Sequence, residues 1–232
     1  MHTSIEFSDE VGEVFPEQLH ATACSLFETN DPDEHRAETK GFSVRFGRPR
    51  GRILDIEFGI LDDGLLTNAE ECLRLQRDRL RVGRRTGDVR HAEVLEIATW
   101  EDLADDADHV EEITIDFETP TFFRRGRAYH LFPSPSVVFG HWRRRWEVFH
   151  SVAPQCEFDD RQVNVVAIDL RTHDLSYRGE RLGGFTGSVT YDVSGLPDSD
   201  RAAMCAFALI GPYAGCGSRT TAGFGAVSVE LV

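Results

Sequence analysis

Four glycines lie within eleven residues near the end of the chain, in the stretch GCGSRTTAGFG at 215–225. Glycine tolerates positive φ and lets main-chain amides approach another group with no Cβ between them. The stretch is therefore either a contorted turn or a cradle that holds an anion such as a phosphate. The second interpretation predicts a set of anion-contacting residues: Gly215, Gly217, Ser218, Arg219, Thr220, Gly223 and Gly225.

A second group of candidate anion contacts lies near the middle of the chain. Arg124, Arg125 and Arg127 flank Phe122 and Phe123, a combination that suits phosphate pairing beside base stacking. Further arginines are dense between residues 45 and 52 and between 74 and 90, where they could hold nucleic acid or balance neighbouring acids. Those at 143–145 lie between two tryptophans that are expected to face inward, so the arginines are expected on the solvent-exposed face of a helix.

The whole chain of 232 residues is acidic, with 40 acidic and 25 basic side chains and a net charge of −15. This balance argues against a protein coated with basic charge but leaves local basic patches possible. Lys40 is the only lysine, and every other basic side chain is arginine.

The spacing of the cysteines and the hydropathy of the chain indicate which cellular compartment and which cofactors to expect. The five cysteines show no CxxC or Cys/His spacing, which predicts free thiols and no zinc site. We expect no metal and no other cofactor. No apolar run approaches the roughly 18 residues of a membrane span, so a cytoplasmic protein without membrane contact is expected.

The candidate residues must be positioned by an α+β fold in which one order of elements occurs twice. The first expected set consists of a strand at 3–7, a helix from Pro16, strands at 42–46 and 52–61, a helix at 65–80 with Thr67 and Glu70 as a capping box, and a strand at 92–98. The second consists of a strand at 112–118, a helix at 135–150, strands at 162–170 and 184–193, a helix at 198–210 capped by Asp198 or Ser199, and a strand at 224–232.

Each set has the β-α-β-β-α-β order of the ferredoxin-like fold. The acidic stretch 101–118, which has no lysine or arginine, marks the connection between them. The sequence therefore predicts two tandem ferredoxin-like domains, at 1–110 and 111–232.

Four segments resemble one known family. The glycine pattern at 215–225 looks like the glycine-rich loop of the repeat-associated (RAMP) RNA-binding proteins of CRISPR systems. The segments 119–149 and 181–195 are similar to parts of the second domain of the CRISPR precursor-RNA-processing endoribonucleases, and 31–44, DPDEHRAETKGFSV, resembles that family's histidine-bearing loop.

The resemblance implies metal-independent cleavage of CRISPR repeat RNA. In the family the ribose 2′-hydroxyl attacks the adjacent phosphate, which leaves a 2′,3′-cyclic phosphate and a 5′-hydroxyl. Such a reaction needs a base, an acid and positive charge beside the phosphate. The resemblance points to His35 as the proton-transfer residue and to Lys40 as the cation, with His20 on the first helix as the competing histidine.

Two questions stay open at this point. Family members often add a tyrosine to the site, and this chain has none in its first half, so a site with two histidines is an alternative. The second question is whether the chain is instead a non-catalytic RNA-binding subunit of a CRISPR effector complex, which would have other subunits of that complex as partners. The expected partner of the endoribonuclease is CRISPR repeat RNA, whereas such a subunit would hold the guide RNA without cutting it.

Overall fold

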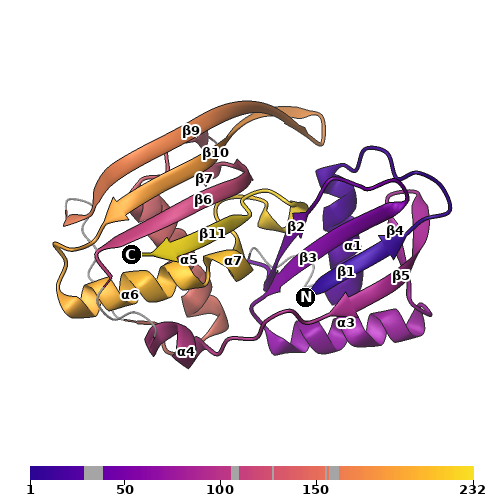
Figure 1. Cartoon of the computed structure of the whole chain (residues 1–232), viewed down its shortest axis with the longest axis horizontal. Helices are drawn as coiled ribbons and strands as arrows, with labels where there is room; N and C mark the ends of the chain where they lie inside the picture. Colours follow the sequence, from indigo (N-terminus) through magenta and orange to yellow (C-terminus); the bar gives the residue numbers. More distant parts are fainter. Residues whose placement is uncertain (29–38, 106–109, 127, 155, 157–161) are drawn as a thin grey trace. The chain divides into compact units, whose positions relative to one another are not determined.

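The computed structural model describes residues 1–28, 39–105, 110–126, 128–154, 156 and 162–232. The chain divides into two compact units (Figure 1). The first comprises Met1–Ile97 together with Arg219–Gly223, and the second comprises Ala98–Ser218 together with Phe224–Val232. The chain thus returns to the first unit for five residues of the glycine-rich stretch.

In the residues that the structure describes, the first unit has a five-stranded antiparallel sheet and two α-helices. Its strands stand in the order β2-β3-β1-β5-β4. Its elements, in chain order, are β1 (His2–Glu6), α1 (Pro16–Phe27), β2 (Phe42–Phe46), β3 (Ile53–Ile60), α3 (Asp63–Leu75), β4 (Arg79–Val82) and β5 (Arg85–Glu93), with the short 3-10 helix η2 (Thr220–Ala222) contributed by the later segment.

Alternation along the strands builds the core of this unit. Ile5 in β1 and Leu54, Ile56 and Phe58 in β3 are almost completely buried, while the residues between them are more exposed. Because strand side chains alternate between faces, one face of the sheet is apolar and packs against the buried sides of the two helices, and the other carries the charges.

The second unit repeats the same core order and adds to it. Its four-stranded sheet has the order β11-β6-β10-β9, and a separate two-stranded hairpin pairs β7 with β8. The elements are α4 (Trp100–Asp105), β6 (Glu112–Thr121), β7 (Phe123–Arg125), β8 (Ala128–His130), α5 (Pro135–Phe149), β9 (Asn164–Tyr177), β10 (Glu180–Asp192), α6 (Asp198–Leu209), α7 (Gly211–Ala214) and β11 (Val227–Leu231).

The expected fold class is confirmed, since each unit contains the β-α-β-β-α-β series of a ferredoxin-like domain in the sheet order that such a series forms. In the described part of the chain, no helix is long and apolar enough to cross a membrane.

Several expected elements differ from the observed ones. The helix predicted to reach Leu80 ends at Leu75, because Arg77 and Asp78 adopt positive φ and turn the chain into β4. The strand expected at 92–98 is β5 at Arg85–Glu93, which pairs with both β1 and β4.

The predicted helix starts were also wrong in detail. The N-cap of helix α3 is Asp62, five residues before the predicted capping box at Thr67, and its carboxylate accepts a hydrogen bond from the Gly64 amide at 2.9 Å. Helix α6 follows Pro197 as its N-cap, with no side-chain cap hydrogen bond.

Candidate functional site

Helix α1 carries polar side chains along one stripe. His20, Cys24 and the C-cap residue Glu28 are spaced four residues apart, so they follow one another up the same face. His20 is half-buried, and its Nδ1 lies 3.0 Å from the Thr221 hydroxyl oxygen, with the Cys24 sulfur 3.7 Å from its Nε2. The imidazole is therefore held in place from the glycine-rich segment and from the next turn of its own helix.

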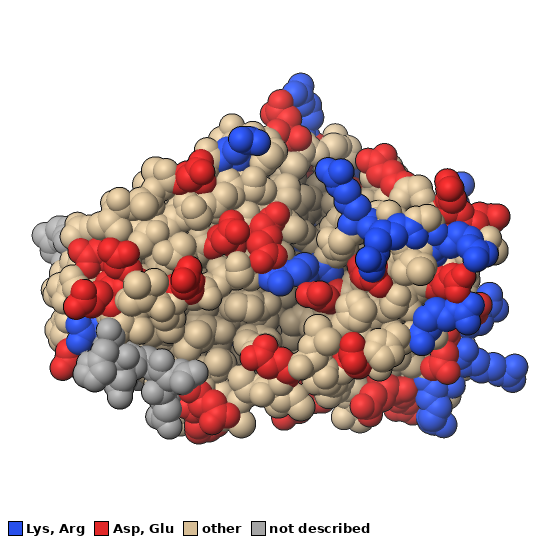
Figure 2. Space-filling model, in the orientation of Figure 1, with Lys and Arg blue, Asp and Glu red and all other residues tan. Residues whose placement is uncertain are grey.

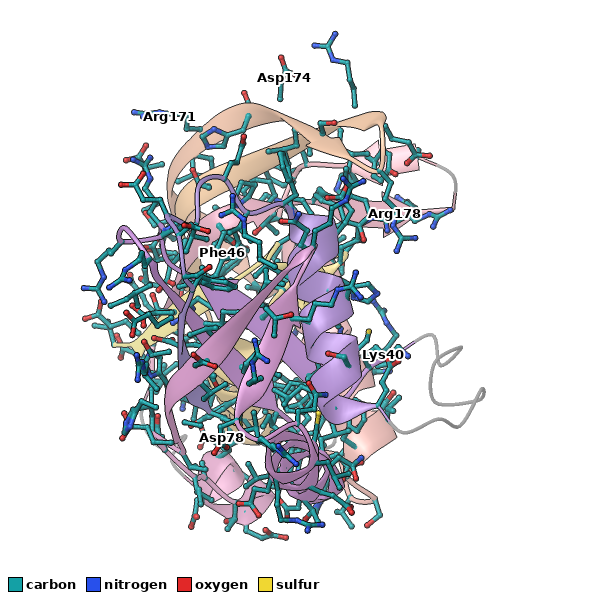
Figure 3. The ribbon with its side chains drawn as sticks, turned by 90° about the vertical axis from the view of Figure 1, so that its right-hand side faces the viewer. Lys40, Phe46, Asp78, Arg171, Asp174 and Arg178 are labelled. Atoms are coloured by element: carbon teal, nitrogen blue, oxygen red, sulfur yellow. The ribbon has the colours of Figure 1, made fainter. Side chains whose placement is uncertain are left out.

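The last group on this stripe is an ion pair. The Lys40 ammonium lies 2.6 Å from a carboxylate oxygen of Glu28, and both side chains are largely buried. Figure 3 labels Lys40. The pair joins Glu28, which directly precedes residues 29–38, to Lys40, which follows that segment and Thr39. His35 falls within that segment, outside the described residues, so its proposed role stays a prediction.

The first half of the glycine-rich stretch does not have the expected amide cradle. The Gly215 amide donates to the Gly211 carbonyl at 2.8 Å, the Cys216 amide to Gly225 at 2.7 Å, and the Ser218 amide to Phe122 at 2.8 Å. Amides that are already paired within the fold have no proton left for a phosphate. The prediction that main-chain amides hold an anion is therefore wrong for these three residues. The predicted contacts of the side chains in this stretch stay predictions.

Close packing explains why glycines occur there. A Cβ on Gly225 would lie 1.9 Å from the Cys216 carbonyl oxygen, and a Cβ on Gly217 would lie 2.6 Å from that of Phe122. Both glycines also have positive φ, at 68° and 92°. The structure thus favours the turn interpretation for residues 215–217.

The second half of the stretch belongs to the first unit. Arg219 adopts the left-handed conformation at φ 63°, the η2 turn follows, and Gly223 closes it at φ 89°. A Cβ on Gly223 would lie 2.7 Å from the Phe46 ring, and Thr220 is 1% exposed. Packing against β2 and α1 therefore brings Thr221 to His20, and leaves Arg219 half-buried.

Helix α5 supports the turn from within the second unit. The Trp142 indole donates a hydrogen bond to the Gly215 carbonyl at 2.8 Å, and Trp142 itself is fully buried. Arg145 is 9% exposed, and burial lowers its pKa to about 10. The prediction that 143–145 form only a wet face is therefore wrong for Arg145, because the helical repeat places it beside the buried tryptophans.

The arginines of the β7–β8 hairpin are exposed, but the aromatics beside them are not. Phe122 is fully buried and Phe123 is 5% exposed, so the expected base stacking on these two rings is wrong. Arg124 and Arg125 lie on β7, where Arg124 is directly opposite the exposed Tyr129 of β8. The third arginine, Arg127, lies outside the described residues.

Arginines of the first unit gather on its surface together with acids (Figure 2). Five of these arginines, on the strands or next to them, are paired with acids of the same unit. The pairs are Arg45–Glu57, Arg50–Asp55, Arg52–Glu6, Arg79–Asp88 and Arg90–Glu6. Exposed pairs of this kind contribute little to stability, and a polyanion would have to compete with these carboxylates for the same arginines.

Comparison with known proteins shows a family likeness in the second half of the chain. Residues 115–227 match the family model described as CRISPR-associated endoribonuclease Cas6. This part of the chain is therefore similar to the Cas6 endoribonucleases. The Cas6 endoribonuclease of Mycobacterium tuberculosis is 28% identical over 121 residues, which are 50% of this chain and 38% of that protein. That of Streptococcus thermophilus is 26% identical over 122 residues, 50% of each chain.

The similarity in fold extends beyond residues 115–227. A solved Cas6 product complex superposes with a TM-score of 0.80 at 21% identity, covering 99% of this chain and all of that one. At this identity the likeness shows a shared fold across both units. The sequence matches span half or less of the curated relatives.

Proposed function

We propose that this chain is a CRISPR-associated endoribonuclease that cleaves precursor RNA within its repeats to give guide RNAs. The observation that carries the proposal is the 3.0 Å contact between the His20 imidazole and the Thr221 hydroxyl, in a chain whose residues 115–227 match the Cas6 family model. The contact supports the proposal because a histidine, a residue type that can transfer protons, lies beside the segment from which Ser218 and Arg219 are proposed to contact RNA.

The proposed reaction needs no metal. The ribose 2′-oxygen forms a bond to the adjacent phosphorus while the bond from phosphorus to the 5′-oxygen breaks. A base removes the 2′ proton, an acid protonates the departing 5′-oxygen, and positive charge stabilises the crowded phosphate. The products are a 2′,3′-cyclic phosphate and a 5′-hydroxyl.

The Thr221 hydroxyl suits either role of His20. A hydroxyl can accept a hydrogen bond from a proton on Nδ1. With Nδ1 protonated, the neutral ring has a lone pair on Nε2 and can act as a base, whereas the imidazolium also carries a proton on Nε2 and can act as an acid. The contact orients the ring in both states, as partners of catalytic histidines do.

His35 and Lys40 complete the proposed set. His35 is proposed as the main proton-transfer residue on the strength of the 31–44 resemblance, and His20 as the second histidine. Lys40 is proposed as the cation beside the phosphate. Since Lys40 is paired with Glu28, the phosphate must compete with that carboxylate for the ammonium.

The RNA-contacting surface is proposed from side chains and not from the paired amides. Ser218 and Arg219 are half-buried on the glycine-rich stretch, and Arg124 and Arg125 are exposed on β7. Arginine suits such contacts because its planar fork matches phosphate oxygens. Gly215, Gly217, Gly223 and Gly225 then act by shaping the stretch, with Thr220 buried beneath it.

The test is incubation of the purified chain with its own repeat RNA in EDTA, followed by analysis of the fragment ends. We expect one cut per repeat, a cyclic phosphate and a 5′-hydroxyl, and no cut when the nucleotide before the site lacks its 2′-hydroxyl. Cleavage of that deoxy substrate would point to attack by water and refute the mechanism. His35→Ala is expected to stop cleavage with binding retained, and His20→Ala run beside it assigns the histidines.

One observation favours the alternative of a non-catalytic RNA-binding subunit. The only lysine is held in a largely buried ion pair, which reduces the charge it presents to a phosphate. The same experiment separates the two functions, because a scaffold subunit would bind the repeat in EDTA and leave it whole.

A further inference from the structure

Strand β9 is the longest strand of the second unit and stands at the edge of its sheet (Figure 1, orange). In the described part of the chain, β10 is the only strand that pairs with it. An edge strand presents a row of amide and carbonyl groups that another strand can pair with. The outer side of β9 is therefore a template for a further strand.

This edge has few of the usual protections. The sequence of β9, NVVAIDLRTHDLSY, contains no lysine, proline or glycine. Val166 and Ile168 are both 51% exposed, and of the fourteen residues only Tyr177 is buried. Long edges with exposed apolar side chains are sites of strand addition unless something covers them.

The pairing with β10 defines the two faces of β9. Ile168 is opposite Val189, which is 1% exposed, so Ile168 and Leu170 lie on the core side of the sheet. Asp169 and Arg171 alternate with them and lie on the other side. Figure 3 shows the Arg171 side chain projecting outward from the ribbon.

These charges are arranged symmetrically about Leu170. In an antiparallel pair of two β9 strands with Leu170 opposite its own copy, Asp169 of each chain faces Arg171 of the other. Moving the partner by two residues in either direction puts Asp169 against Asp169, or Arg171 against Arg171. Like charges directly opposite each other destabilise a strand pair, and opposite charges stabilise it.

We propose that a second copy of this chain pairs with β9 in the register centred on Leu170. The two-fold arrangement gives two Asp169–Arg171 pairs on the open side and two Ile168–Thr172 pairs on the core side, where β-branched side chains pack well. The charge pattern favours a copy of this chain over a foreign strand because it is complementary to itself.

The bulge in β9 sets the length of this ladder. The register with β10 shifts between Thr190 and Tyr191, which face Ala167 and Val165, so Val166 is the extra residue. A bulge interrupts regular pairing and increases the local twist. The two-fold ladder therefore runs from Ala167 to His173, and at each end Ala167 of one chain lies opposite His173 of the other. None of the proposed RNA-contacting residues lies on β9, so the proposal is independent of the proposed function.

The first experiment measures the mass of the full chain in solution by light scattering over a range of concentrations. We expect a dimer of the 26.1 kDa chain. Arg171→Asp should raise its dissociation constant by at least about tenfold, since both cross-strand pairs become repulsive. Asp169→Arg together with Arg171→Asp should restore it. Arg178→Asp, at the hairpin tip, makes the same charge change outside the ladder and should leave the dimer unchanged.

The second experiment tests the register. Leu170→Cys should form a disulfide between chains under mild oxidation, because directly opposite Cα atoms lie within disulfide range. Thr172→Cys should not, and the wild type with its five free cysteines gives the background. A monomer at every concentration, a dimer insensitive to Arg171→Asp, or cross-linking at Thr172 in place of Leu170 would overturn the proposal.

Discussion

Gly225→Ala tests whether the glycine-rich stretch is a packed turn or an open cradle. The new Cβ would lie 1.9 Å from the Cys216 carbonyl oxygen, so the two segments must separate. Separation breaks the 2.7 Å hydrogen bond from the Cys216 amide to Gly225 and leaves buried polar groups unpaired. The substitution also places a Cβ at φ 68°.

The expected loss follows from three contributions. Left-handed backbone costs a non-glycine residue about 1–2 kcal/mol. A lost hydrogen bond with a buried unpaired group costs about 1–3 kcal/mol, and forcing extra volume into packed structure about 1–3 kcal/mol. Because the chain can relax in part, we expect a total of about 4 kcal/mol, or a fall in Tm of about 10 °C.

The matched control is Gly179→Ala in the same unit. Gly179 has φ 80°, and nothing lies within 4 Å of its added Cβ, so only the backbone cost of about 1 kcal/mol applies. Thermal and urea unfolding of both variants give the comparison. Equal losses of stability for the two, together with a loss of RNA affinity for Gly225→Ala alone, would contradict the packed turn and favour the cradle.

Three further predictions follow from the site. Thr221→Val should lower kcat about tenfold with little change in KM because His20 loses its orienting partner, and Thr221→Ser should restore it; a fully active valine variant would show that the contact is only structural. Lys40→Met should destabilise the first unit by about 2 kcal/mol because the Glu28 carboxylate stays buried without the lysine charge beside it, and Glu28→Gln added to this variant should recover part of the loss. Urea unfolding of the two single variants and the double variant measures the coupling, and a coupling energy of zero would refute the prediction. Burial and two neighbouring arginines lower the pKa of His141 well below its ordinary value, so below about pH 6.5 the unfolded chain takes up a proton that the folded chain does not. The free energy of unfolding should therefore fall by about 1–2 kcal/mol between pH 7 and pH 5. The His141→Leu variant should show a smaller fall, and an equal fall in the two proteins would exclude the effect.

Most of the architecture could be predicted from periodicity and end signals. Strand β2 at Phe42–Phe46 and the start of α5 at Pro135 agree with the predicted bounds, because alternation and an N1 proline are local features. The turn after α3 could not be predicted in the same way. Arg77 and Asp78 adopt a backbone that these residues rarely take, and only the pairing of β4 with β5 explains it.

The candidate site shows the same limit at longer range. The predicted set contained His20 and the segment holding Thr221, but their contact joins residues 201 positions apart, which no spacing rule reveals. The buried state of Phe122 was missed because its arginine neighbours suggested an exposed platform, whereas the ring packs against Tyr129 and Phe224. The glycines were recognised as unusual, and only coordinates could show that carbonyl oxygens occupy the space beside them.

The return of residues 219–223 to the first unit affects how the molecule can be made and divided. On a ribosome, the sheet and helices of the first unit emerge before the turn that packs against Phe46 and His20, which is synthesised only after Ala98–Ser218. A fragment cut after Ile97 would lack this turn, and a circular permutation or a supplied peptide would be needed to restore it.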